Sequence, residues 1–219
     1  MDNQLEARFF IRSDLREDTF IVPLPQTWWS RPYEYAWCAQ FVREQEVVLD
    51  AACGISHPFK FYLGSCNLSE VHACDWDERI ASKEAIFADA VHDFGEEAAH
   101  RLFQHTDWSK LQLAQASITS LPYEDNYFDT VFCISVLEHL SEQDQLAALQ
   151  QFHRVLKPEG RLVLTFDYPM VDLDLLYNYA TNAGFICPAS FTGNLPPDAL
   201  RSEIWGTLYC FRALLQKGS

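Results

Sequence analysis

One stretch constrains the fold more than any other: an apolar run, one acid, a turn of small residues and a proline, over residues 47–58. The run Val47-Val48-Leu49-Asp50 predicts a short strand buried on both faces. Residues 51–56 are small enough for a tight turn with its backbone open to a ligand, and Pro58 stands where a helix would begin. This order predicts a nucleotide-binding crevice at the carboxyl end of a parallel strand, although an ordinary strand-to-helix connection has the same pattern.

Composition bounds the class of protein. The 219 residues, 48% of them hydrophobic, suit one sizeable core. The net charge of −15 and the lack of a basic cluster disfavour a nucleic-acid partner, because phosphate binding depends on Lys and Arg. No apolar stretch approaches the roughly 20 residues of a membrane span, and the N-terminus is unlike a secretory signal. The seven scattered cysteines suit a reducing compartment. We therefore expect a cytoplasmic protein without a nucleic-acid or membrane partner.

Residues 1–45 precede this strand and are rich in aromatic side chains. A serine that can cap, a proline in the first turn and helical spacing predict one short helix within residues 30–41. Its aromatic stripe fits core packing and also fits a lid over a pocket. We divide the chain into an aromatic-rich segment, residues 1–45, which is a candidate lid, and a main domain, residues 46–219. Trp28 and Trp29 are adjacent and cannot face the same way, so at least one is a candidate for a pocket wall.

A second acid ends the next predicted strand, Val71-His72-Ala73-Cys74-Asp75, about 25 residues after Asp50. A carboxylate at this strand tip can accept hydrogen bonds from the two hydroxyls of a ribose. Such bonds contribute roughly 1.5–3 kcal/mol each. The alternative role is a helix N-cap, for which Asp77 is the better candidate. Asp75 is therefore predicted to bind a ribose.

The rest of the chain alternates predicted strands and helices. Strands are expected at residues 111–116, 127–135, 161–167, 185–187 and 207–215. The last two have no helix between them and should pair antiparallel at the edge of an otherwise parallel sheet. Three histidines lack the i, i+4 pairing of a metal site and have no accompanying cysteine, so no metal is predicted; they are His92, His100 and His105.

Five segments in this order resemble the class I S-adenosylmethionine-dependent methyltransferases, specifically the small-molecule group called type 11. They are VLDAACG at 48–54, Asp75, LPYEDNYFD at 121–129, VLEHL at 136–140 and VLKPEGRLVL at 155–164. The resemblance covers roughly residues 46–217. It implies an α/β, Rossmann-like fold with a seven-stranded, mostly parallel sheet, helices on both faces and an antiparallel C-terminal edge hairpin. It also implies S-adenosyl-L-methionine as cofactor and a small-molecule methyl acceptor, and we expect a monomer or homodimer.

The resemblance assigns roles by position. The turn after Asp50 would face the amino-acid part of the cofactor, Asp75 would hold its ribose and Trp76 would pack on its adenine. The cofactor-binding residues implied in this way are Asp50, Ala51, Ala52, Cys53, Gly54, Asp75, Trp76, Ser117, Ile118 and Ser135. The acceptor pocket would be lined by Trp28, Trp29, Tyr33, Tyr35 and Tyr168. Such aromatic walls favour a flat or apolar acceptor.

The turn departs from the family pattern, because Ala52 and Ser56 replace its first and third glycines. A left-handed conformation would cost either residue roughly 1 kcal/mol or more. The lack of G-x-G-x-x-G also disfavours a nicotinamide dehydrogenase. The chain is predicted to transfer a methyl group by in-line displacement. The missing glycines leave one alternative open, a weak or inactive methyltransferase-like protein that serves as a ligand-binding or protein-interaction module.

A general base is needed only where the acceptor must lose a proton. The candidates are His139, His57 and Asp167. Each has a structural alternative: His139 as a helix-start residue bonded to backbone, His57 as part of the turn, and Asp167 as a cap.

Overall fold

The computed structural model describes residues 5–188, 191, 193–204 and 206–218. It separates into two compact units, Leu15–Ile118 and a second unit made of Met1–Asp14 with Thr119–Ser219. The predicted domain boundary after residue 45 and the lid role of the preceding segment stay predictions. Within the described ranges, no helix is both long and apolar enough to cross a membrane. Each of the seven cysteines lies in a described range and is free.

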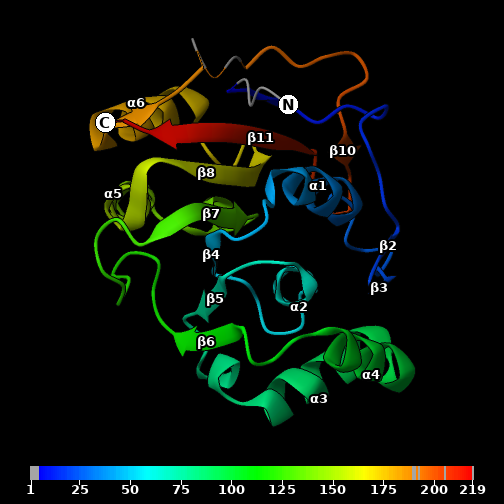
Figure 1. The fold of residues 1–219 in the computed structure, drawn as a ribbon. Coiled ribbons are helices and arrows are strands. Elements are labelled where there is room, and N and C mark those ends of the chain that lie inside the picture. Colours follow the sequence, from blue (N-terminus) through cyan, green and yellow to red (C-terminus); the bar gives the residue numbers. More distant parts are fainter. Residues whose placement is uncertain (1–4, 189–190, 192, 205, 219) are drawn as a thin grey trace. The chain divides into compact units, whose positions relative to one another are not determined.

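Three parallel strands form the sheet of the Leu15–Ile118 unit (Figure 1). β4 (Val47–Ala51) pairs with β5 (Glu70–Asp75), and β5 pairs with β6 (Leu111–Gln115). Their registers end at Ala51↔Cys74 and Asp75↔Gln115, so the carboxyl ends of all three strands meet at one edge. The other elements are β2 (Thr19–Phe20), β3 (Val22–Pro23), α1 (Arg31–Cys38), η1 (Ala39–Phe41), α2 (Phe59–Ser65), η2 (Glu78–Ala81), α3 (Lys83–Phe94) and α4 (Glu96–His105).

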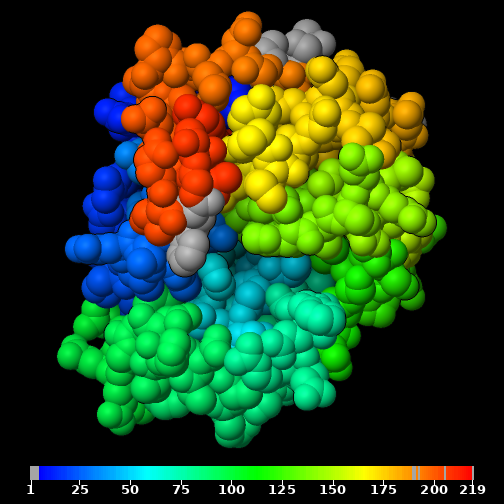
Figure 2. Space-filling model, turned by 180° about the vertical axis from the view of Figure 1, so that it is seen from behind, coloured from blue at the N-terminus to red at the C-terminus, as the bar shows by residue number. Residues whose placement is uncertain are grey.

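The helices of this unit follow the sequence signals. The predicted helix within residues 30–41 is confirmed as α1 and η1, with proline in its first turn. Gly95, with a φ of 84°, ends α3 and starts α4. The Ser82 hydroxyl caps α3 by accepting a hydrogen bond from the Ala85 amide. α3 and α4 together form a continuous part of the surface of this unit, coloured green in Figure 2.

The second unit carries a mixed sheet in the order β1-β11-β8-β7, with β9 and β10 also paired to β11. β7 and β8 are parallel, whereas β8 and β11 are antiparallel. The predicted antiparallel pairing of the last two strands is confirmed where β9 meets β11 at Gln216↔Ile186. The elements are β1 (Ala7–Phe9), β7 (Phe128–Ile134), η3 (Leu137–His139), α5 (Glu142–Val155), β8 (Leu156–Tyr168), α6 (Leu173–Ala183), β9 (Phe185–Ile186), β10 (Arg201–Ser202) and β11 (Leu208–Lys217).

Two features of this sheet differ from the sequence expectations. β1 lies outside β11 and pairs with it antiparallel, so residues assigned to the N-terminal segment extend the sheet. β8 begins at Leu156, directly after α5, although its start was expected at residue 161. A three-residue strand is too short for a period-two pattern, which is why β1 gave no signal. Both sheets bury branched and aromatic side chains, among them Leu49 and Val71 in one and Phe132 and Phe211 in the other.

Candidate functional site

The turn after β4 is left-handed at two positions. Ala52 has a φ of 54° and Gly54 a φ of 64°. A Cβ atom at Gly54 would lie 2.5 Å from His57 Cδ2, so both backbone angle and space require glycine there. Ala52 adopts the conformation that the sequence analysis identified as costly for alanine, at about 1–2 kcal/mol. The turn is therefore formed despite the missing first glycine, at the expense of backbone strain.

Ser56, which replaces the third glycine, has a structural partner. Its side chain is buried, and its hydroxyl donates a 2.5 Å hydrogen bond to Asp93 Oδ2 on α3. A glycine could not make this bond. The serine thus ties the turn to the neighbouring helix.

Asp50, the next-to-last residue of β4, has one carboxylate oxygen without a hydrogen-bond partner among the described residues. The residue is 2% exposed, and this oxygen is its Oδ2 atom. Burial, which outweighs the opposing charge of Lys60, raises the pKa of Asp50 to about 7, and Asp75 adds to the rise. A buried acceptor without a donor is costly unless a ligand supplies one. A perturbed carboxylate of this kind is typical of a binding site.

Lys60, in the first turn of α2, was not predicted. It is fully buried, and its Nζ atom donates to Gly54 O at 2.7 Å and to His57 O at 2.9 Å. Burial lowers the pKa of this ammonium group, while Cys53, Asp50 and Asp75 act to raise it. The signal that could have revealed it is a lone cation in the apolar run 59–63, directly after the turn.

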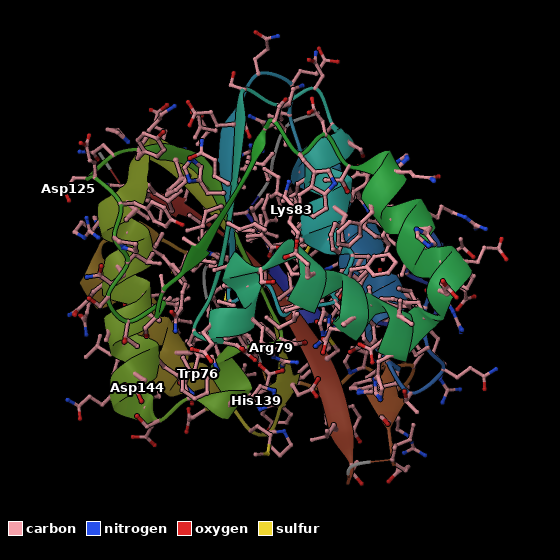
Figure 3. The ribbon with its side chains drawn as sticks, turned by 90° about the horizontal axis from the view of Figure 1, so that it is seen from below. Trp76, Arg79, Lys83, Asp125, His139 and Asp144 are labelled. Atoms are coloured by element: carbon pink, nitrogen blue, oxygen red, sulfur yellow. The ribbon has the colours of Figure 1, made fainter. Side chains whose placement is uncertain are left out.

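Asp75 joins the turn to the end of β5. Its Oδ2 atom accepts from the Gly54 amide at 2.9 Å, and its Oδ1 atom accepts from the Asp77 amide at 3.0 Å. A carboxylate offers about four lone-pair sites, so acceptor capacity for a ligand hydroxyl remains. Asp77 caps η2 through the Arg79 amide, which confirms its predicted capping role. Trp76, labelled in Figure 3, is 80% exposed, and its carbonyl accepts from Gln115 Nε2 at 3.2 Å.

His57 is held on several sides. Its Nδ1 atom lies 2.7 Å from the Tyr35 hydroxyl oxygen. Its ring stacks on Trp28, with centroids 4.2 Å apart and planes at 9°. Burial, and then the charges of Arg31 and Lys60, hold the pKa of His57 well below its usual value, so the ring is neutral at pH 7. The structure thus brings together one predicted base candidate and two predicted pocket residues.

The other candidates of this unit lie around the same strand ends. Ala51 and Cys53 are buried, and the Cys53 amide donates to Cys74 O at 2.9 Å. Trp29 is half-buried, and Tyr33 is buried beneath the Arg16 guanidinium, 5.7 Å above its ring. Ser117 is exposed and Ile118 buried, shortly after β6. Their cofactor and substrate roles stay predictions.

The second unit holds the remaining candidates at the ends of β7 and β8. Ser135 follows β7 with a φ of 50°, and its amide donates to Thr165 O at 2.8 Å. The Asp167 amide donates to Glu138 Oε1 at 3.2 Å. His139, labelled in Figure 3, ends η3 and is exposed. Tyr168 is half-buried and packs edge-on against Phe9. The catalytic and substrate roles predicted for these residues remain untested.

Comparison with known proteins identifies related sequences. A family model described as a methyltransferase domain matches residues 49–164. A ubiquinone/menaquinone biosynthesis C-methyltransferase, UbiE of Hahella chejuensis, is 34% identical over 89 residues, which are 40% of this chain and 35% of that protein. The matched segment thus spans about a third of this relative's length.

Solved structures show the fold. A 1,6-didemethyltoxoflavin-N1-methyltransferase of Burkholderia thailandensis, with bound substrate and S-adenosylhomocysteine, has a TM-score of 0.54 at 18% identity, covering 85% of this chain and 77% of that one. The [4+2]-cyclase SpnF has a TM-score of 0.60 at 15% identity, covering 96% and 86%. At these identities the likeness concerns the fold alone. It confirms the predicted Rossmann-like α/β fold with parallel strands and antiparallel edge strands.

Proposed function

Because the chain belongs to the S-adenosylmethionine-dependent methyltransferase family whose domain model matches residues 49–164, we propose that it transfers a methyl group to a small-molecule acceptor by in-line displacement. The observation that carries the proposal is the end of β4. There, a buried carboxyl oxygen of Asp50 has no hydrogen-bond donor among the described residues. It lies beside a turn in which Gly54 has no space for a side chain. An amino-acid ammonium group is a donor of the required charge.

The residues of the Leu15–Ile118 unit fit the cofactor. In the proposal, Asp50 accepts from the ammonium group of its amino-acid part, and Asp75 accepts from the ribose through its remaining lone pairs. The exposed indole of Trp76 is free to stack on the adenine, next to Ser117 and Ile118 in the sequence assignment. Ser135, which belongs to the second unit, keeps only its sequence-based assignment to the methionine portion. The turn residues Ala51, Ala52 and Cys53 supply backbone around the same portion.

The chemistry asks little of the protein. S-adenosylmethionine supplies a methyl group that is already activated by its sulfonium sulfur. Holding an acceptor in line at about 3 Å supplies much of the rate by proximity. The aromatic side chains proposed to line the acceptor pocket exclude water and favour a flat or apolar acceptor. We propose that the protein works in the cytoplasm as a monomer or homodimer, with no nucleic-acid or membrane partner.

Titration with S-adenosylhomocysteine tests the cofactor part. A ligand at 100 times its dissociation constant should raise the free energy of unfolding by about 2.7 kcal/mol. Calorimetry and thermal unfolding with and without the ligand measure this. No binding at millimolar ligand contradicts the proposal.

Transfer of a labelled methyl group to metabolite extracts, followed by mass spectrometry, tests the acceptor part. The base candidates His139, His57 and Asp167 are then replaced singly. A true base is the one whose loss lowers turnover about 100-fold or more without changing S-adenosylhomocysteine affinity.

One alternative keeps support. The strained Ala52 and the cyclase among the fold neighbours favour a methyltransferase-like protein that binds a ligand without methyl transfer. Tight binding of S-adenosylhomocysteine with no label transfer to any extract component would support that reading.

A further inference from the structure

His57 is fixed more firmly than a turn residue requires. One ring nitrogen is bonded to Tyr35, one ring face is covered by Trp28, and the Cδ2 edge lies against Gly54. The second nitrogen, Nε2, is next to that edge and has no hydrogen-bond partner within the described part of the chain. The His57 ring is therefore immobilised, and its Nε2 atom remains able to bind a ligand beside the Gly54 turn.

The bond to Tyr35 decides which nitrogen carries the proton. Tyr35 is 1% exposed, and the His57 ring is the hydrogen-bond partner of its hydroxyl. Burial raises the pKa of this phenol well above 10, so it stays protonated and needs an acceptor. In a neutral imidazole one nitrogen accepts and the other carries hydrogen. If Tyr35 donates to Nδ1, the proton lies on Nε2, which then acts as a donor and is unable to serve as a base.

The charged groups acting on the ring favour a negative ligand. They are the guanidinium of Arg31 on α1 and the ammonium of Lys60 on α2. The Lys60 ammonium donates a hydrogen bond to the His57 carbonyl at 2.9 Å. Arg31 also pairs with Glu34. Because these two cations are the charges that act on the ring itself, an N–H donor there suits an oxyanion, whereas the Asp50 carboxylate at the same turn suits a cationic group.

We propose that His57, locked by Tyr35 as an Nε2–H donor, binds an oxyanion beside the Gly54 turn. The ligand class is a carboxylate or similar oxygen anion, carried either by the cofactor or by the methyl acceptor. The inference deepens the proposed function and rests on it for the identity of the ligand. It also replaces the predicted role of His57 as general base, and it makes Tyr35 a positioning residue that acts through His57.

Nuclear magnetic resonance tests, without any ligand, whether Tyr35 fixes the tautomer of His57. Protein labelled with ¹⁵N-histidine is examined by long-range ¹⁵N–¹H correlation, and the His57 signals are assigned by their absence in His57→Gln. The expected result at pH 7 is the Nε2–H tautomer. Tyr35→Phe should shift the ring toward the other tautomer, whereas Tyr62→Phe should leave it unchanged. Tyr62 is a matched control, because its ring also packs on Phe20 and Phe59. An Nδ1–H tautomer in the unaltered protein overturns the proposal.

Ligand titration tests the oxyanion. His57→Leu should weaken binding of the oxyanion ligand about tenfold or more. His57→Gln keeps an N–H near the position of Nε2 and should retain most of the affinity for that ligand. One arm titrates S-adenosylhomocysteine against 5′-methylthioadenosine, which lacks the amino-acid carboxylate. The other titrates benzoate into protein saturated with 5′-methylthioadenosine.

A loss confined to S-adenosylhomocysteine assigns the oxyanion to the cofactor, and a loss confined to benzoate assigns it to the acceptor. Equal affinities of the Leu variant and the unaltered protein in both arms overturn the proposal, as does a Gln variant no better than Leu. Circular dichroism and thermal unfolding verify that each variant is folded. Failure of the unaltered protein to bind S-adenosylhomocysteine would instead contradict the proposed function. The tautomer measurement needs no ligand, so it tests the role of Tyr35 independently of that function.

Discussion

The strand ends of the two units are held in different ways. In the Leu15–Ile118 unit, buried charged side chains bind the backbone of the turn: Asp75 accepts from the Gly54 amide and Lys60 donates to the Gly54 carbonyl. In the second unit, a backbone bond to Thr165 holds Ser135, and the Glu138 carboxylate accepts from one amide at the end of β8, that of Asp167. In the turn, both the backbone N–H and the backbone C=O of Gly54 are thus fixed by charge-assisted hydrogen bonds, which are about twice as strong as neutral ones.

This difference explains how the turn persists with few glycines. A glycine-rich loop adopts left-handed angles freely, whereas here two buried charges and the Ser56–Asp93 bond stabilise the same shape against the strain at Ala52. These hydrogen bonds are all formed in the protein without a ligand. At the ends of β7 and β8, Ser135 is buried and Asp167 and Tyr168 are half-buried, and none of them shows which acceptor would bind.

The largest effect is expected from Gly54→Ala. The added methyl group would lie 2.5 Å from His57 Cδ2 at a φ of 64°, so we expect a loss of about 2–4 kcal/mol in the free energy of unfolding. Gly95→Ala is the matched control, because its φ is 84° but no atom lies within 4 Å of the added carbon. It should lose only the strain of its own backbone conformation, φ 84° and ψ 163°, which costs about 1–3 kcal/mol. Urea unfolding compares the two, and equal losses would show that the turn is not tightly packed.

Asp75→Ala should weaken S-adenosylhomocysteine binding by at least tenfold while the fold remains. It removes the proposed ribose acceptor and releases the Gly54 amide, and each bond to a charged group contributes about 1.5–3 kcal/mol. Asp77→Ala provides the control. It removes the cap of η2 and leaves the hydrogen bonds of the Gly54 turn in place. Calorimetric titration that finds unchanged affinity in Asp75→Ala would remove this residue from the ribose role.

Much of the fold could be predicted from the sequence because its signals are local. Apolar runs marked the strands from β4 to β8, and a proline in the first turn marked the start of α1. β1 escaped because three residues carry no periodicity, and its place depends on pairing with β11 across the length of the chain. The start of β8 escaped for a different reason: the strand follows α5 directly, so no turn residue marks the boundary between them.

For the site, the sequence could name residues but not their partners. Asp50, Gly54 and Asp75 were identified from motif positions, and these do meet around one turn. Lys60 was missed because a lone lysine in an apolar helix is usually solvated, and only tertiary packing buries it against two carbonyls. The Tyr35–His57 bond joins residues 22 apart in sequence, so no local pattern announces it.

The pH dependence of ligand affinity tests the role of the Asp50 carboxyl near the end of β4. Asp50 has a pKa of about 7, so half of it is protonated near neutrality, and only the ionised form attracts an ammonium group. Affinity for S-adenosylhomocysteine should therefore approach a plateau as the pH rises past 7, while the ligand's ammonium group stays protonated, and should fall by up to about tenfold per unit well below pH 7. Lys60 is also perturbed, so Asp50→Asn is the control that isolates this carboxyl. The variant should bind more weakly and lose the dependence near pH 7; a slope that persists in it assigns the titration to another group.

The smallest effect is expected from Ala52→Gly, and it tests whether charge or glycine sets the turn. Relief of the left-handed strain at a φ of 54° is worth about 1–2 kcal/mol, but glycine also gives the unfolded chain about 0.4–1 kcal/mol of extra conformational entropy. The net gain in unfolding free energy should therefore be about 1 kcal/mol or less, with S-adenosylhomocysteine affinity unchanged. Ala51→Gly, one residue earlier in β4, has no strain to relieve and should be destabilising. A large rise in affinity in Ala52→Gly would mean that the buried charges hold the turn in a shape that binds poorly, and would favour the ligand-binding alternative over an efficient enzyme.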